Sequence, residues 1–160
     1  MTTPAYAKIV ALCKNTEINE NVKDVHEILG IDFATAVLAF NDDCLVNFQQ
    51  ATALLLPTAQ WLDQFAQITE QGQNFAVGYL SGFHRIEDSW NTMEIESGSD
   101  FEQILQTTTL LLSKLANPNT DDLEMQNLFE QLPDFNEIVA SLPMLVSTLG
   151  FFALQVKNDE

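Results

Sequence analysis

The sequence FAVGYLSGFHRIEDSW at residues 75–90 says the most about this chain, because it places Gly78 and Gly82 four residues apart in an apolar stretch that leads to Trp90. Four residues are about one turn of an α-helix, so both glycines lie on one helix face. Glycine inside a helix costs roughly 0.5–1 kcal/mol relative to alanine. Two glycines at this spacing therefore predict the close approach of another backbone. The aromatic residues expected to pack beside this strip are Phe75, Tyr79 and Phe83.

The rest of the chain also has a helical pattern, and no alternating pattern of a β-strand is sustained. Before the glycine motif we expect helices at residues 4–14, 20–29, 33–40, 44–56 and 58–70. Their predicted boundaries are Gly30 as a stop signal, the polar residues 41–43 as a break, and Pro57 as an end. The sequence Gln71-Gly72-Gln73 is expected to end the fifth helix.

Further helices are expected after the glycine motif, which itself covers residues 74–84. These are a short helix or turn at 86–93, then residues 101–116, a helix opened by Thr120, and residues 135–156. Pro143 predicts a kink or a break in the last helix, since proline removes one backbone hydrogen bond. The sequence therefore predicts an all-α fold over residues 1–160, as a single irregular domain of about eight or nine helices.

Charge is the most unusual feature of the composition. The chain has 23 acidic residues against six lysines and arginines, a formal net charge of −17. Such a surface repels nucleic acid and anionic lipid, so we expect neither as a direct partner. The charge serves solubility first, and it also suits a basic protein partner.

Location in the cell is predicted from the apolar stretches. Residues 1–8 lack the layout of a signal peptide. The longest apolar stretch, near residues 142–154, contains Pro143 and Ser147, and we expect it to be too short to span a membrane. The prediction is a cytoplasmic protein.

Catalytic motifs are missing from the sequence. The chain has no Gly-x-Ser-x-Gly motif, and Cys13 and Cys44 lie in apolar surroundings without the positive charge that a reactive thiolate needs. We interpret both cysteines as buried reduced thiols, although the sequence leaves a disulfide open. We predict no catalytic residue and no cofactor.

One weak metal motif is present. His84, Glu87 and Asp88 are spaced so that they share a helix face, and imidazole with carboxylates can bind zinc, manganese or iron. No second His or Glu motif completes a ligand shell, and His26 stands alone. We therefore predict no metal site and interpret these as surface residues, with Arg85 pairing with a neighbouring acid. A metal-dependent enzyme that uses this triplet is kept as an alternative.

The central motif, with Phe75, Gly78, Tyr79, Gly82 and then Trp90, resembles that of the uncharacterised bacterial YecA/YgfB-like family. A following apolar helix, here 101–115, and a late Pro-Val segment before aromatics, here 142–152, are also similar. The resemblance covers roughly residues 30–155 and implies an all-α fold, with action through protein contacts and in some cases regulation. Some members carry a Cys-rich zinc-binding tail. We expect none here, because no cysteine follows Cys44.

The function favoured by these observations is that of a non-enzymatic, cytoplasmic protein-binding or regulatory module. Aromatic residues meet the only arginine of the chain at the expected interaction surface, which consists of Phe83, His84, Arg85 and Trp90. An acidic decoy that mimics nucleic acid and occupies a basic protein is the second hypothesis. A ligand or partner groove along the two glycines and a homodimer are also left open by the pattern.

Overall fold

The computed structural model describes residues 25–158, and the predicted helix at 4–14 lies outside this range. The described residues form six α-helices and no strand. The helices are α2 (Val25–Gln50), α3 (Glu70–Arg85), α4 (Glu87–Thr92), α5 (Asp100–Ala116), α6 (Leu123–Glu130) and α7 (Phe135–Asn158). A short 3-10 turn, η1 (Thr58–Gln60), precedes α3. The all-α prediction is confirmed for this part of the chain, and the prediction of eight or nine helices is wrong.

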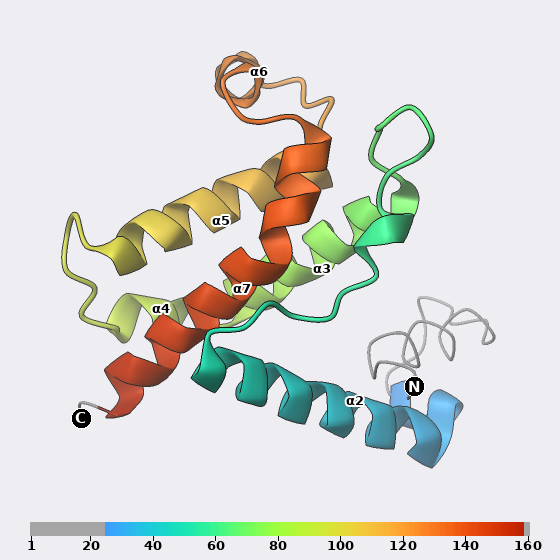
Figure 1. Cartoon of the computed structure of the whole chain (residues 1–160), viewed down its shortest axis with the longest axis vertical. Helices are drawn as coiled ribbons and strands as arrows, with labels where there is room; N and C mark the ends of the chain where they lie inside the picture. Colours follow the sequence, from blue (N-terminus) through green and yellow to red (C-terminus); the bar gives the residue numbers. More distant parts are fainter. Residues whose placement is uncertain (1–24, 159–160) are drawn as a thin grey trace.

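The helix α7 runs through the middle of the molecule (Figure 1). It packs against α2 on one side and α5 on the other, and α5 in turn packs against α3. Figure 1 shows α4 at one end of α3, and the loop that follows η1 at the opposite end. This arrangement leaves the C-terminal half of α3 and the short α4 at the edge of the helix packing.

The core lies between α3, α5 and α7. Its buried members are Trp61, Ala76, Leu111, Leu112, Leu115, Ile138, Val139 and Leu142. Full burial of a large apolar side chain stabilises a fold by roughly 1.5–3 kcal/mol. Trp61 is only 1% exposed although it belongs to a loop, so it anchors that loop to the helices.

The predicted breaks before residue 50 are wrong, because α2 continues through Gly30 and through residues 41–43. One glycine inside a long helix costs only about 1 kcal/mol, and Asp42 and Asp43 are exposed, where water satisfies their carboxylates. The helix ends at Gln50 rather than at Pro57. Ala51 has a positive φ of 51°, and its N–H donates to Phe48 O (3.3 Å) while the N–H of Thr52 donates to Asn47 O (3.0 Å). This is a Schellman motif with alanine in the place that glycine usually takes.

The predicted helix at 58–70 is also wrong. After η1 the chain forms a tight loop at residues 61–69, here called the Asp63 loop, closed by an isolated antiparallel bridge between Leu62 and Ile68. One carboxylate oxygen of Asp63 accepts the N–H groups of Phe65 (2.8 Å) and Gln67 (2.9 Å). Aspartate favours turns through such bonds to nearby backbone, and here this outweighs the helical spacing of the apolar residues.

The predicted break at 71–73 is instead the first turn of α3. The side chain of Thr69 caps this helix by accepting the N–H of Gly72 (3.3 Å). Gly72 is needed for packing, since a Cβ built there would lie 2.9 Å from the carbonyl oxygen of Trp61.

Later boundaries agree better with the sequence. The helix predicted at 101–116 is observed as α5, and Ser99 caps it, with its Oγ accepting the N–H of Glu102 (3.2 Å). The helix α6 is capped by Asp122 rather than Thr120.

The helix α7 is continuous across Pro143, and it bends along its length (Figure 1). Of the two outcomes predicted at Pro143, a kink or a break, the kink agrees with the structure. By length and composition alone, its residues Phe135–Val156 suffice to cross a membrane, with a mean hydropathy of 1.7. The expectation that this stretch is too short was thus wrong. In the structure, Ile138 and Leu142 of this helix belong to the core.

Candidate functional site

An apolar hollow of about 370 Å³ lies where α3 meets α4, and we call it the α3–α4 groove. Its lining residues are Gly78, Tyr79, Gly82, Phe83, Ile86 and Trp90. All but one come from α3 and its C-terminal cap, and Trp90 is supplied by α4. The groove thus coincides with the segment that the sequence singled out.

The two glycines form an open strip in this groove. Apart from the adjoining backbone of α3 and the two neighbours of each glycine, no described atom lies within 4 Å of a Cβ built on Gly78 or on Gly82. The close approach that the sequence predicts at these glycines is therefore not made by any residue between 25 and 158. The reason is that α5 and the Asp63 loop pack on α3 through other positions, such as Gly72 and Ala76.

Stacked aromatic rings form one wall of the groove. The rings of Phe83 and Trp90 stack with centroids 4.9 Å apart and an interplanar angle of 22°. Trp90 then meets Phe101 of α5 at 6.4 Å, and Phe101 stacks on Phe152 of α7 at 5.5 Å. Aromatic pairs in such geometries contribute about 0.5–1.5 kcal/mol beyond their burial. This series of rings fixes the short α4 to two long helices.

Tyr79 and Phe75 connect the groove to the core, as both pack against the buried cluster. Phe75 stacks on Trp61 with centroids 4.3 Å apart. Burial, with a smaller effect of the neighbouring Cys44, raises the pKa of Tyr79 to about 12. Its hydroxyl therefore stays protonated at neutral pH.

Cys44 is a free, half-buried thiol on α2. Burial raises its pKa to about 11, and the charge of Asp43 adds to the effect. A thiol with a raised pKa is a poor nucleophile at neutral pH, which agrees with the interpretation of Cys44 as unreactive. Cys13 lies outside the described residues.

The rim of the groove carries charge. Arg85, three residues after Gly82, is exposed beside it, whereas His84 is exposed on the other side of α3, two turns after Val77. Phe83 and Trp90 are partly buried. Within the described part of the chain Arg85 forms no ion pair, so the predicted pairing with a neighbouring acid is not made there. The only arginine of the chain thus lies beside an apolar hollow, with no carboxylate from residues 25–158 in ion-pair contact with it.

Trp90 also has an unpaired donor. Its indole Nε1 is buried and has no hydrogen-bond acceptor among the described residues. A buried donor without a partner costs about 1–3 kcal/mol. The indole N–H at this edge of the groove therefore lacks a hydrogen bond to the described residues.

The metal alternative finds no geometric support. His84, Glu87 and Asp88 are all exposed. Among residues 25–158, no three His, Cys, Asp or Glu side chains come together in a way that could hold a metal ion.

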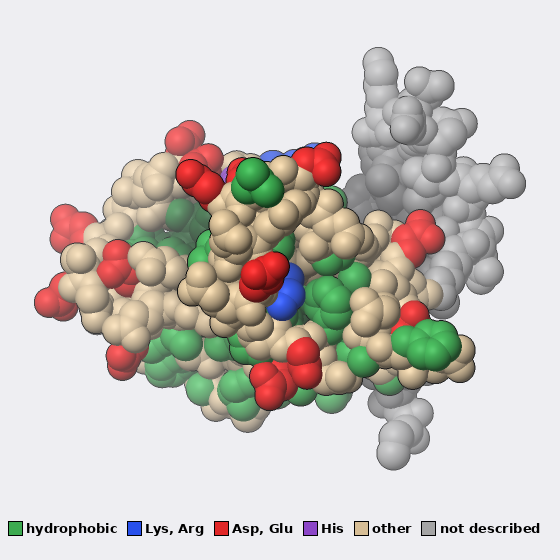
Figure 2. Space-filling model, turned by 90° about the horizontal axis from the view of Figure 1, so that it is seen from above, with side chains coloured by type: hydrophobic (Ala, Val, Ile, Leu, Met, Phe, Trp, Pro, Cys, Tyr) green, Lys and Arg blue, Asp and Glu red, His purple; other side chains and the backbone are tan. Residues whose placement is uncertain are grey.

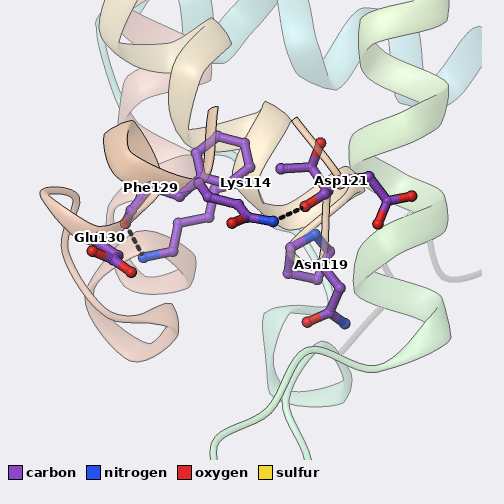
Figure 3. Close-up of a pocket in the computed structure, with 8 residues that line it drawn as sticks. Lys114, Asn119, Asp121, Phe129 and Glu130 are labelled. Carbon is purple, nitrogen blue, oxygen red and sulfur yellow. Dashed lines mark hydrogen bonds between the residues drawn. The ribbon is translucent and has the colours of Figure 1, made fainter. Parts of the chain in front are cut away.

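A second hollow, of about 440 Å³, lies between the end of α5 and α6, and no pattern in the sequence indicated it (Figure 3). Lys114 reaches across it and donates to the carbonyl oxygens of Phe129 (3.0 Å) and Pro133 (2.9 Å). Its Nζ also lies 5.5 Å from the ring centroid of Phe135. These contacts tie α5 to the turn between α6 and α7, so Lys114 has a structural role here.

The other side of this hollow is formed by the loop between α5 and α6. Figure 3 shows Asn119 and Asp121 on that side and Glu130 near Lys114. Gln126 Nε2 donates to Thr120 O (2.6 Å) across the start of α6. The side chains of Lys114 and Gln126 already donate to carbonyl oxygens of this chain. The α3–α4 groove is therefore the better candidate for binding.

No protein-family model, no curated protein and no solved structure matches this chain.

Proposed function

We propose that this chain is a non-enzymatic protein-binding module and that its interaction surface is the α3–α4 groove with its rim. The observation that carries the proposal is an open apolar strip at Gly78 and Gly82, bordered by stacked aromatic rings and by Arg85, which has no ion pair in the described residues. Protein interfaces favour this combination, because Trp, Tyr and Arg supply much of the binding energy at their centres.

The surface residues expected from the sequence fit this role. Phe83 and Trp90 provide rigid apolar area that is only partly buried, and Arg85 is exposed beside the glycines. His84 is exposed as well, but it lies on the side of α3 that carries Val77. Rigid aromatic walls lower the cost of ordering side chains upon binding. We further propose a cytoplasmic location and, in line with the resemblance to the YecA/YgfB-like family, a regulatory role through protein contacts.

The acidic decoy is less favoured. A mimic of nucleic acid needs carboxylates in a ridge with a spacing like that of phosphates. On the face seen in Figure 2 the Asp and Glu side chains are dispersed, with apolar and neutral surface between them. Dispersed charge of this kind serves solubility.

Site-specific photo-crosslinking tests the proposal. A photoreactive phenylalanine analogue replaces Ile86 in the groove, and a matched control replaces Val77; these side chains are 50% and 48% exposed. Val77 lies nine residues before Ile86, which places it on roughly the opposite side of the helix.

Crosslinks are collected in cells that express the full chain. The proposal expects one defined protein to be captured at position 86 and not at position 77. That protein is either a different protein or a second copy of this chain. Equal capture at both positions, or no protein captured at position 86, would overturn it.

A further inference from the structure

The most exposed aromatic side chain in the described part of the chain is at the tip of the Asp63 loop. Phe65 is 73% exposed, although the loop around it is tightly bonded. Asp63 holds both sides of the tip through its carboxylate, and the N–H of Asp63 donates to Gln67 O (2.9 Å). At the base, the N–H of Thr69 donates to Trp61 O (2.8 Å), and Trp61 is buried in the core. The loop therefore presents Phe65 in a fixed position rather than on a flexible segment.

A rigid exposed phenyl ring and an open apolar groove are complementary in chemistry. The groove is lined by aromatic and aliphatic carbon and by the open strip of Gly78 and Gly82, and its 370 Å³ is ample for one aromatic side chain. We propose that Phe65 of one copy of this chain docks in the α3–α4 groove of a second copy. This inference rests on the proposed function, because it takes the groove as the interaction surface and names its occupant.

The contact cannot form within one molecule. The Asp63 loop packs on Gly72 near the start of α3, whereas the groove surrounds Gly82. Ten residues of helix separate these positions by about 15 Å. Figure 1 shows the loop and α4 at opposite ends of α3. Since Trp61 anchors the loop to the core, Phe65 reaches a groove only on another copy.

Local charge favours the same pairing. Asp63 is the only charged residue in the segment 51–69, and it is exposed two residues from Phe65. Only one of its carboxylate oxygens takes part in the loop bonds. Arg85 at the rim of the groove has no ion pair in the described residues. Docking of Phe65 thus brings a carboxylate to the one arginine of the second copy.

The association is weak by this reasoning. One aromatic side chain buries about 150–250 Å², far below the roughly 1,200–2,000 Å² of stable interfaces. Each copy also carries a net charge of −17, which repels the other copy at low salt. Salt screens this long-range repulsion, so self-association is expected to strengthen as salt rises. Binding to a basic protein would show the opposite dependence.

Complementation between two variants of the full chain tests the inference. Phe65→Ser removes the exposed ring, and Gly82→Leu fills the groove. Gly82→Leu is compatible with the fold, because a Cβ at this position meets no described atom. Leu55→Ser is the matched control, since Leu55 is 75% exposed and belongs to neither surface.

The readouts are sedimentation velocity at about 0.1–1 mM protein and the indole N–H NMR signal of Trp90, each at low and high salt. Wild type and Leu55→Ser are expected to associate. Each of the two surface variants alone should lose at least about tenfold in association constant. A mixture of the two should associate again, because Phe65 of one variant meets the intact groove of the other.

A mixture that stays monomeric, or a wild type that stays monomeric at high salt, overturns the inference. Equal loss of association in Leu55→Ser overturns it as well. The proposed function is judged separately by the crosslinks from position 86. If these capture a different protein while the mixture stays monomeric, the groove is an interaction surface whose occupant is not a second copy.

Discussion

Gly150 of α7 faces the ring of Phe48 of α2 so closely that a Cβ built on the glycine would lie 2.5 Å from the ring carbon Cγ. Real Cβ atoms do not approach other heavy atoms to this distance, so the two helices pack here only because position 150 carries no side chain. This is the close approach that glycine permits in this fold. It lies about 70 residues beyond the glycine pair that drew the prediction from the sequence.

Gly150→Ala is therefore expected to destabilise the protein. The added methyl group pushes the Phe48 ring away from its position, and overpacking of this kind costs roughly 1–3 kcal/mol. The free energy of unfolding, measured by urea denaturation with far-UV circular dichroism, reports the loss.

Gly78→Ala is the matched control, because its new methyl group meets no described atom. Alanine is the better helix former, so this variant should be neutral or more stable by up to about 1 kcal/mol. Similar losses in Gly150→Ala and Gly78→Ala would contradict the packing described here.

These two glycines show what the sequence can predict and what it cannot. Spacing places Gly78 and Gly82 on one helix face, but only the tertiary arrangement decides which face meets a neighbour. In the same way, the end of α2 depends on Ala51 in a left-handed conformation, for which alanine provides no sequence signal. The apolar spacing at 61–68 predicts a helix, yet the local bonds of Asp63 favour a loop.

The candidate site was predictable in part. The run of aromatic residues ending at Trp90 indicated a surface near Phe83, His84 and Arg85, and in the structure Arg85 is exposed there, whereas His84 is exposed on the other side of α3. The sequence does not predict the groove as the main feature. Two glycines at this spacing have the same sequence whether the strip between them is open or is covered by another helix. The apolar spacing at 61–68 places Phe65 on the apolar face of the helix predicted at 58–70, so periodicity does not predict its exposure.

Ser147→Ala is expected to weaken the junction of α2 and α7. The hydroxyl of Ser147 is fully buried and lies within hydrogen-bond distance of two carbonyl oxygens, Thr52 O (2.5 Å) and Asn47 O (3.2 Å). Without it, the carbonyl oxygen of Thr52 loses its donor, which costs about 1–3 kcal/mol, while Asn47 O keeps the N–H of Thr52. Thermal and urea unfolding measure the effect.

Thr148→Ala serves as its control, because the Thr148 hydroxyl only donates to Met144 O (2.8 Å) within its own helix. We expect a loss below about 0.5 kcal/mol there. If Ser147→Ala is as stable as Thr148→Ala, the hydroxyl of Ser147 does not hold the two helices together.

Lys114→Met is expected to loosen α6 rather than the whole fold. The ammonium group holds Phe129 O and Pro133 O, at the end of α6 and just before α7. A hydrogen bond to a charged group contributes about 1.5–3 kcal/mol. Methionine keeps much of the apolar stem but cannot donate.

Hydrogen exchange by mass spectrometry should then show faster exchange over residues 123–133 while α3 keeps its protection. Lys114→Arg is the comparison variant, because it retains the charge and the donors. Unchanged exchange over α6 in Lys114→Met would mean that the lysine bonds do not stabilise this turn.

Tyr79→Phe tests the electrostatics of the groove floor through pH. The folded pKa of Tyr79 is raised from 10.0 to about 12, mainly by burial. Above pH 10 the unfolded tyrosine ionises while the folded one stays protonated, so ionisation favours unfolding. The stability linked to Tyr79 is complete below pH 10 and is lost as pH rises from 10 to 12, with an upper limit of about 2–3 kcal/mol. Phenylalanine has no proton to lose, so the variant should decline less steeply over this window.

The measurement is the urea midpoint of both proteins between pH 8.5 and 11.5. Cys44 contributes a loss of the same sign between pH 9 and 11, because its folded pKa is raised to about 11. The comparison is therefore repeated in a Cys44→Ala background, which removes the thiol from both proteins. Parallel pH profiles with and without Tyr79→Phe in that background would show that the hydroxyl is not buried as the structure has it. A steeper decline with tyrosine would place an un-ionised phenol at the base of the α3–α4 groove, where its protonated oxygen keeps negative charge away from the apolar floor.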